Sequence, residues 1–370
     1  MMRSKYRMEF PMALPTTMRI ALIEEAGVPA RIVTRPVPAV LAGEVLVRIE
    51  ASGVNPLDLK IFSGKAPHAH HPFPAVLGLD LAGRVEALGA GVHRLREGDA
   101  VFGMTGGVGG IQGSLAEYAA VDARLLALRP PNLTAREAAV LPLVVITAWE
   151  GLIDQAQVNS GDNVLIHGGG GGVGSAAVQI ALAQGARVYA TGSATNRQYI
   201  EKLGATFIDY HHEPVADYVA RLTGNVGFDV VYDTVGAGTL DASFLAVRRG
   251  GHVVSALGWG THSLAPLSMR AATYSGVFTL LPLLTGEGRA HHGEILTQAA
   301  TLITEGKLTP RLDPREFNLS TVAQAYDALS HGTARGKLAI TISNCPNPRH
   351  PARLPMSTPA TLQRFAPRRK

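Results

Sequence analysis

Hydrophobic and polar residues alternate in short runs over roughly residues 18–140. Residues 44–50 place Val45, Val47 and Ile49 on one face, as expected for a half-buried strand. Similar runs, separated by glycine and proline, lie at 18–23, 83–88, 100–102 and 115–121. This part of the chain is therefore predicted to form a β-rich, barrel-like domain.

From residue 163 onward the pattern changes to strands that alternate with helices. Strands are predicted at 164–167, 187–191, 228–233 and 252–257. The intervening helices are predicted over 175–184, 196–203, 214–222 and 240–247. Alternation of this length builds a doubly wound parallel sheet, so the fold class is α/β. Helices over 294–305 and 321–330 then lead to a strand at 337–342, which most simply returns to the first domain.

These patterns divide the 370 residues into two domains and two terminal segments. The two domains are a β-rich domain over 18–140, completed by about 306–345, and a doubly wound domain over 141–305. The terminal segments are an extension over 1–17 and a tail over 346–370. The tail has six prolines and no periodic apolar pattern, so we expect it to be disordered.

Charge and cysteine content narrow the classes of function. The tail carries six basic residues and no acid, which is more than the whole formal charge of +5, so the rest of the chain is close to neutral. A basic tail is not a basic binding face, and we expect no nucleic-acid surface. The single cysteine, Cys345, excludes an internal disulfide framework and fits a cytoplasmic protein. No run of 18 residues is predominantly apolar, so no membrane span is predicted.

A run of glycines follows a predicted strand and opens the next helix. It contains Gly169-x-Gly171-x-x-Gly174, in which the first glycine permits a tight turn, the second admits a pyrophosphate, and the third lets helix and strand pack closely. The helix N-terminus adds free N–H groups and partial positive charge. A flexible turn is the alternative, but the later β–α units favour a dinucleotide site that also includes Gly172 and Val173.

The second strand of this unit does not end in an acidic residue. An NAD site places Asp or Glu there to bind the ribose 2′-hydroxyl, whereas residues 187–198 contain neither. The segment offers Ser193, Thr195, Asn196 and Arg197, which suit a 2′-phosphate with Arg197 as the bidentate partner. A solvated turn and helix cap would explain the same residues. We therefore expect NADPH as the cofactor rather than NADH.

Several motifs together resemble a known enzyme family. They are Gly53-Val-Asn-Pro-Leu-Asp58, Gly78-Leu-Asp-Leu-Ala-Gly83, Gly98-Asp-Ala-Val-Phe102, the glycine run and Gly336-Lys-Leu338. In this order and spacing over about 18–342, they resemble the zinc-independent quinone oxidoreductase branch of the medium-chain dehydrogenase/reductase superfamily. The resemblance implies a GroES-like catalytic domain, a Rossmann domain, a cofactor in the cleft between them, and a homodimer.

The same resemblance bears on zinc. Similar zinc alcohol dehydrogenases have a Cys ligand at the position of Asn55, a His-Glu pair at Leu79-Asp80, and a third ligand within 141–145, where this chain offers none. Catalytic zinc needs three protein ligands, so no metal is expected. A histidine cluster within 68–71 is more simply explained as an exposed loop than as a metal site.

Further site residues are implied by the resemblance. Asn55 is expected beside the nicotinamide or the substrate oxygen, and Asp58 is expected to orient its neighbours rather than to titrate. Lys60 is a candidate hydrogen-bond or proton donor, with a plain surface lysine as the alternative. The positions expected to contact the cofactor are Thr147, Tyr210, Leu257, Gly258, Phe278 and Lys337. Trp259 and Tyr274 are candidates for pocket wall or interface core, and Thr147 could also be a helix-interior threonine.

Three functions are compatible with these features. Without zinc, the acceptor itself must spread the developing negative charge, as quinones and α,β-unsaturated carbonyls do. The first function is therefore NADPH-dependent reduction of such acceptors. The second is enoyl reduction on a thioester, which uses the same hydride chemistry. The third is a non-catalytic NADPH-binding protein whose basic tail touches RNA.

Overall fold

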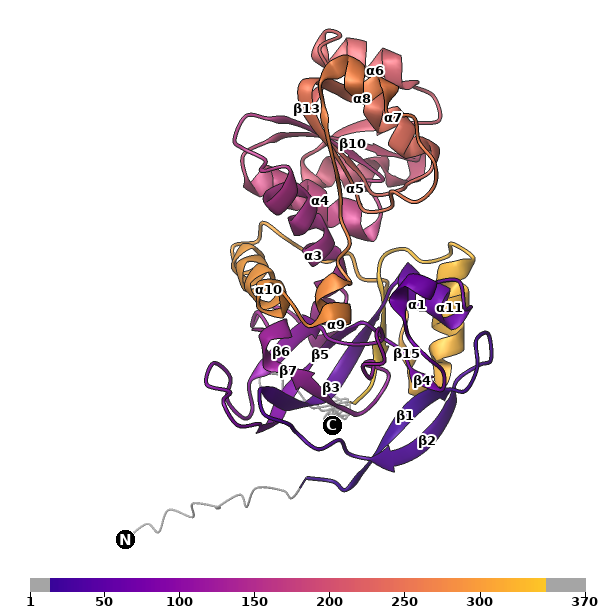
Figure 1. Ribbon diagram of the computed structural model, residues 1–370, viewed down its shortest axis with the longest axis vertical. Helices are drawn as coiled ribbons and strands as arrows, with labels where there is room; N and C mark the ends of the chain where they lie inside the picture. Colours follow the sequence, from indigo (N-terminus) through magenta and orange to yellow (C-terminus); the bar gives the residue numbers. More distant parts are fainter. Residues whose placement is uncertain (1–13, 344–370) are drawn as a thin grey trace, which may run out of the picture.

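The chain folds into two domains that lie one above the other in Figure 1. The structure is a computed structural model that describes residues 14–343. Most of the predicted extension and the whole predicted tail lie outside the described residues. The lower domain holds both the early strands and the last strand of the chain, and the upper domain holds the middle of the chain.

The lower domain is built on strands that pair antiparallel, except that β15 and β16 pair parallel to each other. They are β1 (Thr17–Ile23), β2 (Arg31–Pro36), β3 (Glu44–Val54), β4 (Ala75–Val76), β5 (Asp80–Leu88), β6 (Ala100–Met104), β7 (Tyr118–Asp122), β8 (Leu126–Leu128), β15 (Phe317–Asn318) and β16 (Leu338–Thr341). One sheet has the order β2-β1-β4, and the other has the order β15-β16-β3-β5-β6-β8 with β7 also paired to β3. Because β16 pairs antiparallel with β3, the end of the chain completes the domain in which it began.

The lower domain also contains short helices. They are α1 (Pro56–Phe62), η1 (Pro67–Ala69), η2 (Ala123–Leu125), α2 (Ala135–Ala139), η5 (Leu319–Thr321) and α11 (Val322–Ser330). Helix α1 begins directly after Asn55, because Pro56 fits the first helical position and the backbone N–H of Asn55 donates to Asp58 Oδ2 at 2.8 Å. Asn55 is thereby held where β3 ends and α1 begins.

The upper domain contains a six-stranded parallel sheet. Its strands are β9 (Asn163–His167), β10 (Arg187–Gly192), β11 (Thr206–Asp209), β12 (Phe228–Asp233), β13 (Val247–Ser255) and β14 (Thr273–Gly276). The order is β11-β10-β9-β12-β13-β14. Strand β9 therefore lies in the middle of the sheet. The chain adds β10 and β11 on one side of it and β12, β13 and β14 on the other. In such sheets, ligands bind in the crevice at the carboxyl ends of the strands, at the point where the strand order reverses.

Helices cover both faces of this sheet and join it to the lower domain. They are α3 (Pro142–Trp149), the π-helix η3 (Glu150–Gln155), α4 (Gly172–Ala183), η4 (Ala194–Asn196), α5 (Arg197–Leu203), α6 (Val215–Thr223), α7 (Gly238–Ala246), α8 (Ala265–Arg270), α9 (Leu281–Thr285) and α10 (Arg289–Thr304). The sequence pattern does not predict β11 and β14, which are four-residue strands at the sheet edges with little periodic burial.

Two buried clusters hold the molecule together. One includes Ile49 of β3, Val145 of α3, Val178 of α4 and Leu296 of α10, so it runs through both domains without a break. The other cluster includes Val231 of β12 and Phe244 of α7, and it lies on the opposite face of the parallel sheet. Helix α10 belongs to the span 141–305 that the sequence assigns to the doubly wound domain, yet it packs on β6, β8 and η2 as well as on α3.

Candidate active site between the two domains

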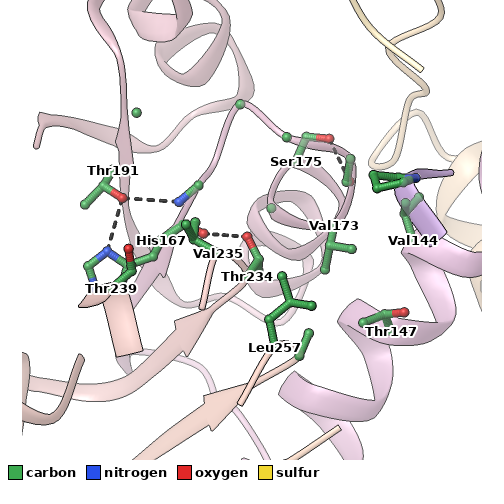
Figure 2. A pocket seen from close by; sticks show the side chains of 18 of the residues that line it. Val144, Thr147, His167, Val173, Ser175, Thr191, Thr234, Val235, Thr239 and Leu257 are labelled. Carbon is green, nitrogen blue, oxygen red and sulfur yellow. Dashed lines mark hydrogen bonds between the residues drawn. The ribbon is translucent and has the colours of Figure 1, made fainter. Parts of the chain in front are cut away.

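A cavity of about 1000 Å³ lies between the two domains. Figure 2 shows how side chains from separate elements, including Thr147 of α3, Val173 of α4 and Leu257 after β13, gather around one part of it. Most residues predicted from the sequence line it, namely Asn55, Lys60, Thr147, Gly171, Gly172, Val173, Gly174, Ser193, Tyr210, Leu257, Phe278 and Lys337. Gly169, Arg197 and Gly258 are not among the lining residues.

The turn of the glycine run is made by Gly168, not by Gly169 as predicted. Gly168 has a φ of +76°, in the left-handed region that favours glycine. Gly169 lies beneath the loop, where a Cβ would come within 2.6 Å of the Ala190 side chain of β10. The glycine at 169 therefore serves packing against the neighbouring strand, which explains why it does not line the cavity.

The following glycines form a cradle suited to a diphosphate. A Cβ on Gly174 would lie 2.1 Å from the carbonyl oxygen of Gly168, so only glycine lets α4 approach the turn this closely. Gly171 caps α4, and the only atom a Cβ there would meet is the Gly168 carbonyl oxygen at 3.3 Å. The space above Gly171 and the free N–H groups of the first turn of α4 thus fit a pyrophosphate. The residues present fit a dinucleotide cofactor.

Polar groups without a free acid gather where β10 ends. Ser193 and Asn196 line the cavity together with Arg311, which comes from the segment after α10. Arg311 Nη1 donates to Asn196 Oδ1 at 2.9 Å, and its guanidinium lies over the Tyr199 ring at 4.1 Å. Gly170 permits this arrangement, because a Cβ there would lie 2.4 Å from Asn196 Cγ.

Arg197 does not line the cavity, and its predicted binding of a 2′-phosphate stays a prediction. Its guanidinium lies over the Phe207 ring at 4.4 Å and its Nη1 is 3.4 Å from Glu201 Oε1, on the exposed side of α5. Because Arg197 is the first residue of α5, its side chain leaves the loop in the direction of the next turn and the neighbouring strand. Arg311 occupies the place that the sequence analysis gave to Arg197.

Tyr210 follows β11 at the same end of the cavity. Its ring lies 4.1 Å from that of His211, and about half of the residue is exposed. The acids nearby are already paired: Asp209 accepts from the His211 backbone N–H at 3.1 Å, and Glu213 Oε2 accepts from Arg221 at 2.7 Å. This end of the cavity therefore presents hydroxyl, amide and guanidinium groups.

A buried polar cluster lies at the opposite end of the cavity, around Asn55. Asn55 Nδ2 donates to Asp80 Oδ2 at 2.9 Å, and Lys337 Nζ donates both to Asn55 Oδ1 and to the Val54 carbonyl oxygen, the latter at 2.7 Å. Asp80 Oδ1 accepts from the backbone N–H of Leu143 at 3.0 Å. Four separate segments of the chain thus meet at one asparagine, whose orientation is set on both sides of its amide.

Burial dominates the electrostatics of this cluster. It raises the pKa of Asp58 and of Asp80 to about 7, although Lys337 opposes the rise at both. Burial lowers the pKa of Lys337, and the two carboxylates oppose that change. Asp58 orients the start of α1 as predicted, but it also titrates near neutral pH, which the sequence analysis did not expect. The reason is that the fold places Asp58 and Asp80 in the same buried site.

The cluster occupies the positions at which zinc relatives would carry ligands, and its residues do not fit zinc. Leu79 is fully buried and offers no donor atom, and Asn55 and Asp80 are bonded to each other. An ammonium group touches Asn55, and a second cation there would meet charge repulsion. Within residues 14–343, no three His, Cys, Asp or Glu side chains lie close enough together to hold a metal ion.

The histidines of 68–71 have different partners from one another. His68 lines the cavity, 5.0 Å from the Trp259 ring, while His71 Nδ1 accepts from the Gly110 N–H at 3.2 Å. Burial and the nearby Lys60 lower the pKa of His68. His68, Trp259 and Phe278 form an aromatic wall that joins the two domains, with ring separations of 5.0–6.3 Å.

Two residues expected near this wall lie behind it. Tyr274 packs edge-on against Phe244 at 5.9 Å and does not line the cavity. A Cβ on Gly258 would come within 2.2 Å of the Tyr274 hydroxyl, so Gly258 permits this packing, and its predicted contact with the cofactor stays a prediction. Leu257 and Trp259, on either side of Gly258, do reach the cavity.

Thr147 combines both interpretations that the sequence left open. Its hydroxyl donates to the Leu143 carbonyl of its own helix at 2.7 Å, as helix-interior threonines do, and it also lines the cavity. It lies 3.1 Å from the Thr279 hydroxyl, which comes from the segment after β14. The sequence analysis missed Thr279 and Arg311, because both reach the site only through tertiary contacts with residues more than 100 positions away.

Two family profiles and several known proteins match this chain. Residues 41–131 match the family profile described as alcohol dehydrogenase GroES-like domain, and residues 203–340 match that described as zinc-binding dehydrogenase. The chain is 33% identical over 312 residues to the chloroplastic NADPH-dependent alkenal/one oxidoreductase of Arabidopsis thaliana, covering 82% of this chain and 73% of the relative. It is 30% identical over 332 residues to the quinone oxidoreductase of Homo sapiens, covering 88% and 98%.

A solved structure is also similar. The chain superimposes with a TM-score of 0.87 and 58% identity on an alcohol dehydrogenase superfamily protein from Novosphingobium aromaticivorans, covering 88% of this chain and 100% of that one. Separately, none of the helices within residues 14–343 combines the length and the apolar character that crossing a membrane requires.

Proposed function

Because this chain belongs to the medium-chain dehydrogenase/reductase superfamily, we propose that it is an NADPH-dependent reductase of quinones or α,β-unsaturated carbonyls that works without zinc. The observation that carries the proposal is the Asn55 cluster, in which an amide and a lysine ammonium stand where zinc relatives have metal ligands. The names of two relatives support the choice of acceptors, since one acts on alkenals and alkenones and the other on quinones.

The proposed acceptors follow from the charge that hydride transfer creates. Zinc stabilises the alkoxide formed from a simple carbonyl, a contribution of several kcal/mol. A quinone or an enone instead delocalises the new charge over its own oxygen and ring or double bond, and hydrogen-bond donors then suffice. Lys60, His68 and Thr279 line the cavity and offer such donors.

The residues of this chain bind and orient the reactants. When bound, the cofactor supplies the hydride. The glycine cradle and the N-terminus of α4 would hold its diphosphate, and Thr147 and Val173 would support the nicotinamide end. The aromatic wall of His68, Trp259 and Phe278 gives a flat acceptor an apolar surface on which to lie.

The preference for NADPH rests on the polar end of the cavity. Ser193, Asn196 and Arg311 provide donors for a 2′-phosphate, and residues 187–198 carry no carboxylate to bind a free 2′-hydroxyl. Arg311 is already oriented by Asn196 and Tyr199, so a planar guanidinium is available for bidentate binding of phosphate at little entropic cost.

Turnover assays with both nucleotides test this proposal. Oxidation of NADPH and of NADH should be followed with benzoquinones, enones and enoyl thioesters, beside measurement of zinc in the purified protein. We expect saturable NADPH binding, turnover with quinones or enones, and no stoichiometric zinc. Stoichiometric zinc, or turnover only with simple alcohols and aldehydes, would contradict the proposal.

The same assays decide between the remaining candidates. Preferred turnover of enoyl thioesters would favour the enoyl reductase. A protein that binds NADPH but turns over no acceptor would favour the non-catalytic candidate, and comparison of RNA binding by the full chain and residues 1–345 across salt concentrations would test the tail. The homodimer and the cytoplasmic location stay predictions.

A further inference from the structure

A chain of hydrogen bonds leads from the cavity into the protein on the side of α10. It begins at Thr147 and Thr279, whose hydroxyl oxygens are 3.1 Å apart on the cavity wall. Thr279 Oγ1 donates to Glu150 Oε2 at 2.7 Å, and Glu150 Oε1 lies 3.3 Å from His292 Nε2. The four side chains come from α3, the segment after β14, the start of η3, and α10.

The position of Thr147 does not depend on Thr279, Glu150 or His292. The hydroxyl of Thr147 is already held by the Leu143 carbonyl, and its own carbonyl accepts from the Tyr232 hydroxyl at 2.6 Å. Thr279, by contrast, is buried with a carboxylate as its acceptor. His292 is fully buried, and its Nδ1 has no hydrogen-bond partner within the described part of the chain. A titratable pair is thus built behind the wall of the cavity.

The pair also has an outlet to water. The side chain of Glu150 is 18% exposed, whereas that of His292 is 1% exposed. Glu150 therefore touches the solvent at one edge and the buried Thr279 and His292 at the other. Proton exchange with the solvent can occur at the carboxyl group without opening the cavity.

The other charged groups on this side have partners elsewhere. Arg289 of α10 bonds to Asp122, and His291 bonds to Asp154 and Glu294. From the elements packed against α10 and η3, Arg124 bonds to Asp122, His252 bonds to Ser275, and Tyr232 donates to the Thr147 carbonyl. Among the described residues, the hydrogen-bond partners of the Glu150 side chain are Thr279 and His292.

We propose that Thr279 protonates the reduced acceptor and is itself reprotonated through Glu150, whose carboxyl group His292 holds in place. The inference rests on the proposed reductase function. Hydride addition to the β-carbon of an enone moves the C=C electron pair onto the carbonyl oxygen and forms an enolate. When Glu150 is in its acid form, the hydrogen bond between the two side chains is reversed and Thr279 accepts from Glu150. The enolate oxygen then takes the Thr279 hydroxyl proton, and the Thr279 oxygen takes the proton of Glu150. Glu150 then regains a proton from water at its exposed edge, so one solvent proton is consumed per hydride.

The relay assigns Thr279 as the group that touches the acceptor, with Glu150 and His292 acting through it. It differs from protonation by Lys60, which lies in α1 of the other domain. The two routes predict that different variants lose activity. Thr279 and Lys60 can each be replaced by a residue of similar size that cannot donate a proton.

The test uses the full-length protein and four variants, Glu150→Gln, Thr279→Val, Thr279→Ser and Lys60→Met. Glutamine can still accept from Thr279 but has no acid form, and serine restores the hydroxyl that valine removes. Enone turnover is measured from pH 5 to 9 in water and in deuterium oxide. NADPH affinity is measured by nucleotide fluorescence, and the ¹⁵N histidine resonances are recorded in the cofactor-free protein.

We expect Thr279→Val and Glu150→Gln to lose on the order of 100-fold in enone turnover, with Thr279→Ser close to the parent protein. The pH profile of Glu150→Gln should be flatter, while NADPH affinity stays within about twofold, because the nucleotide cradle lies elsewhere. In the cofactor-free protein, Glu150→Gln should shift the Nε2 resonance of His292, which loses its carboxylate partner.

Two outcomes would overturn the relay. Parent-like turnover and pH profile in both Thr279→Val and Glu150→Gln, with loss in Lys60→Met, would assign the proton to Lys60 and leave the reductase function intact. A parent protein that binds NADPH but reduces no enone or quinone would remove both the relay and the proposed function.

Discussion

The two ends of the cavity are built in different ways. The diphosphate end consists of backbone from one continuous segment, the turn at Gly168 and the first turn of α4. The opposite end consists of side chains from three distant segments, with Asp80 and Lys337 on either side of the Asn55 amide. The first end depends on the absence of side chains, and the second depends on buried charges that balance one another.

The difference explains what each end tolerates. At the glycine run, an added methyl group meets fixed backbone within 2.1 Å at Gly174, whereas at Gly171 it meets only the Gly168 carbonyl oxygen, at 3.3 Å. At the Asn55 cluster, an added or lost atom matters less than an added or lost charge, because Asp58 and Asp80 are fully buried and the half-buried Lys337 is the cation beside them. Substitutions should therefore separate binding of the cofactor from stability of the protein.

The largest effect is expected when the cluster loses its cation. Lys337→Met should lower the free energy of unfolding by about 3–5 kcal/mol, because removal of one partner leaves buried charge uncompensated. Urea unfolding at pH 7 measures the change. Lys307→Met, at an exposed lysine paired with Glu305, is the matched control and should cost less than about 1 kcal/mol. Equal losses in the two variants would show that the cluster is not held by its charge balance.

A bulky side chain at the diphosphate end should abolish cofactor binding while the fold persists. Gly171→Val places methyl groups on a glycine that lines the cavity, where we expect the pyrophosphate, so NADPH affinity should fall by about 100-fold or more. Gly174→Ala is the contrasting variant and should lower the melting temperature instead, since its Cβ meets the Gly168 carbonyl. Unchanged NADPH affinity in Gly171→Val would move the diphosphate site elsewhere.

An intermediate effect is expected at the end of β10. Arg311→Gln should weaken NADPH binding by about tenfold, the loss of one charge-assisted hydrogen bond, and should leave NADH binding almost unchanged. Arg197→Gln is the control, because Arg197 points toward Glu201 and Phe207. Isothermal titration with both nucleotides measures the four affinities. A larger loss in Arg197→Gln would restore the assignment made from the sequence.

A gradual change rather than a single loss is expected in the pH dependence of stability. The folded-state pKa of Asp58 is raised from 3.8 to about 7, so the folded protein holds this proton more tightly than the unfolded chain does. The resulting stabilisation is fully present below about pH 4 and is lost as the pH rises through 7. Asp58→Asn should flatten this decline, which is at most about 1.4 kcal/mol per pH unit for one proton. Unfolding free energies from pH 4 to 8 test the slope, with Asp99→Asn as the control.

Many elements of the fold were predictable from hydrophobic periodicity. The predicted α/β class, with a GroES-like domain and a Rossmann domain, is confirmed, as is the resemblance to the medium-chain dehydrogenase/reductase superfamily. The strand at 164–167 and the helix after it appear as β9 and α4 because strand, glycine turn and helix are local features. The edge strands β11 and β14 carry too few buried residues to show a period.

The chain by itself determined the nucleotide cradle, because close approach of backbone to phosphate requires glycine at set spacings and leaves a local pattern. It also determined which zinc ligands are absent, since that is a matter of residue identity. Only the tertiary structure decided that Arg311 rather than Arg197 reaches the end of β10, that Asp58, Asp80 and Lys337 share one buried site, and that Thr279 contacts Glu150. Such pairings depend on burial and on contacts between distant segments, which periodicity does not encode.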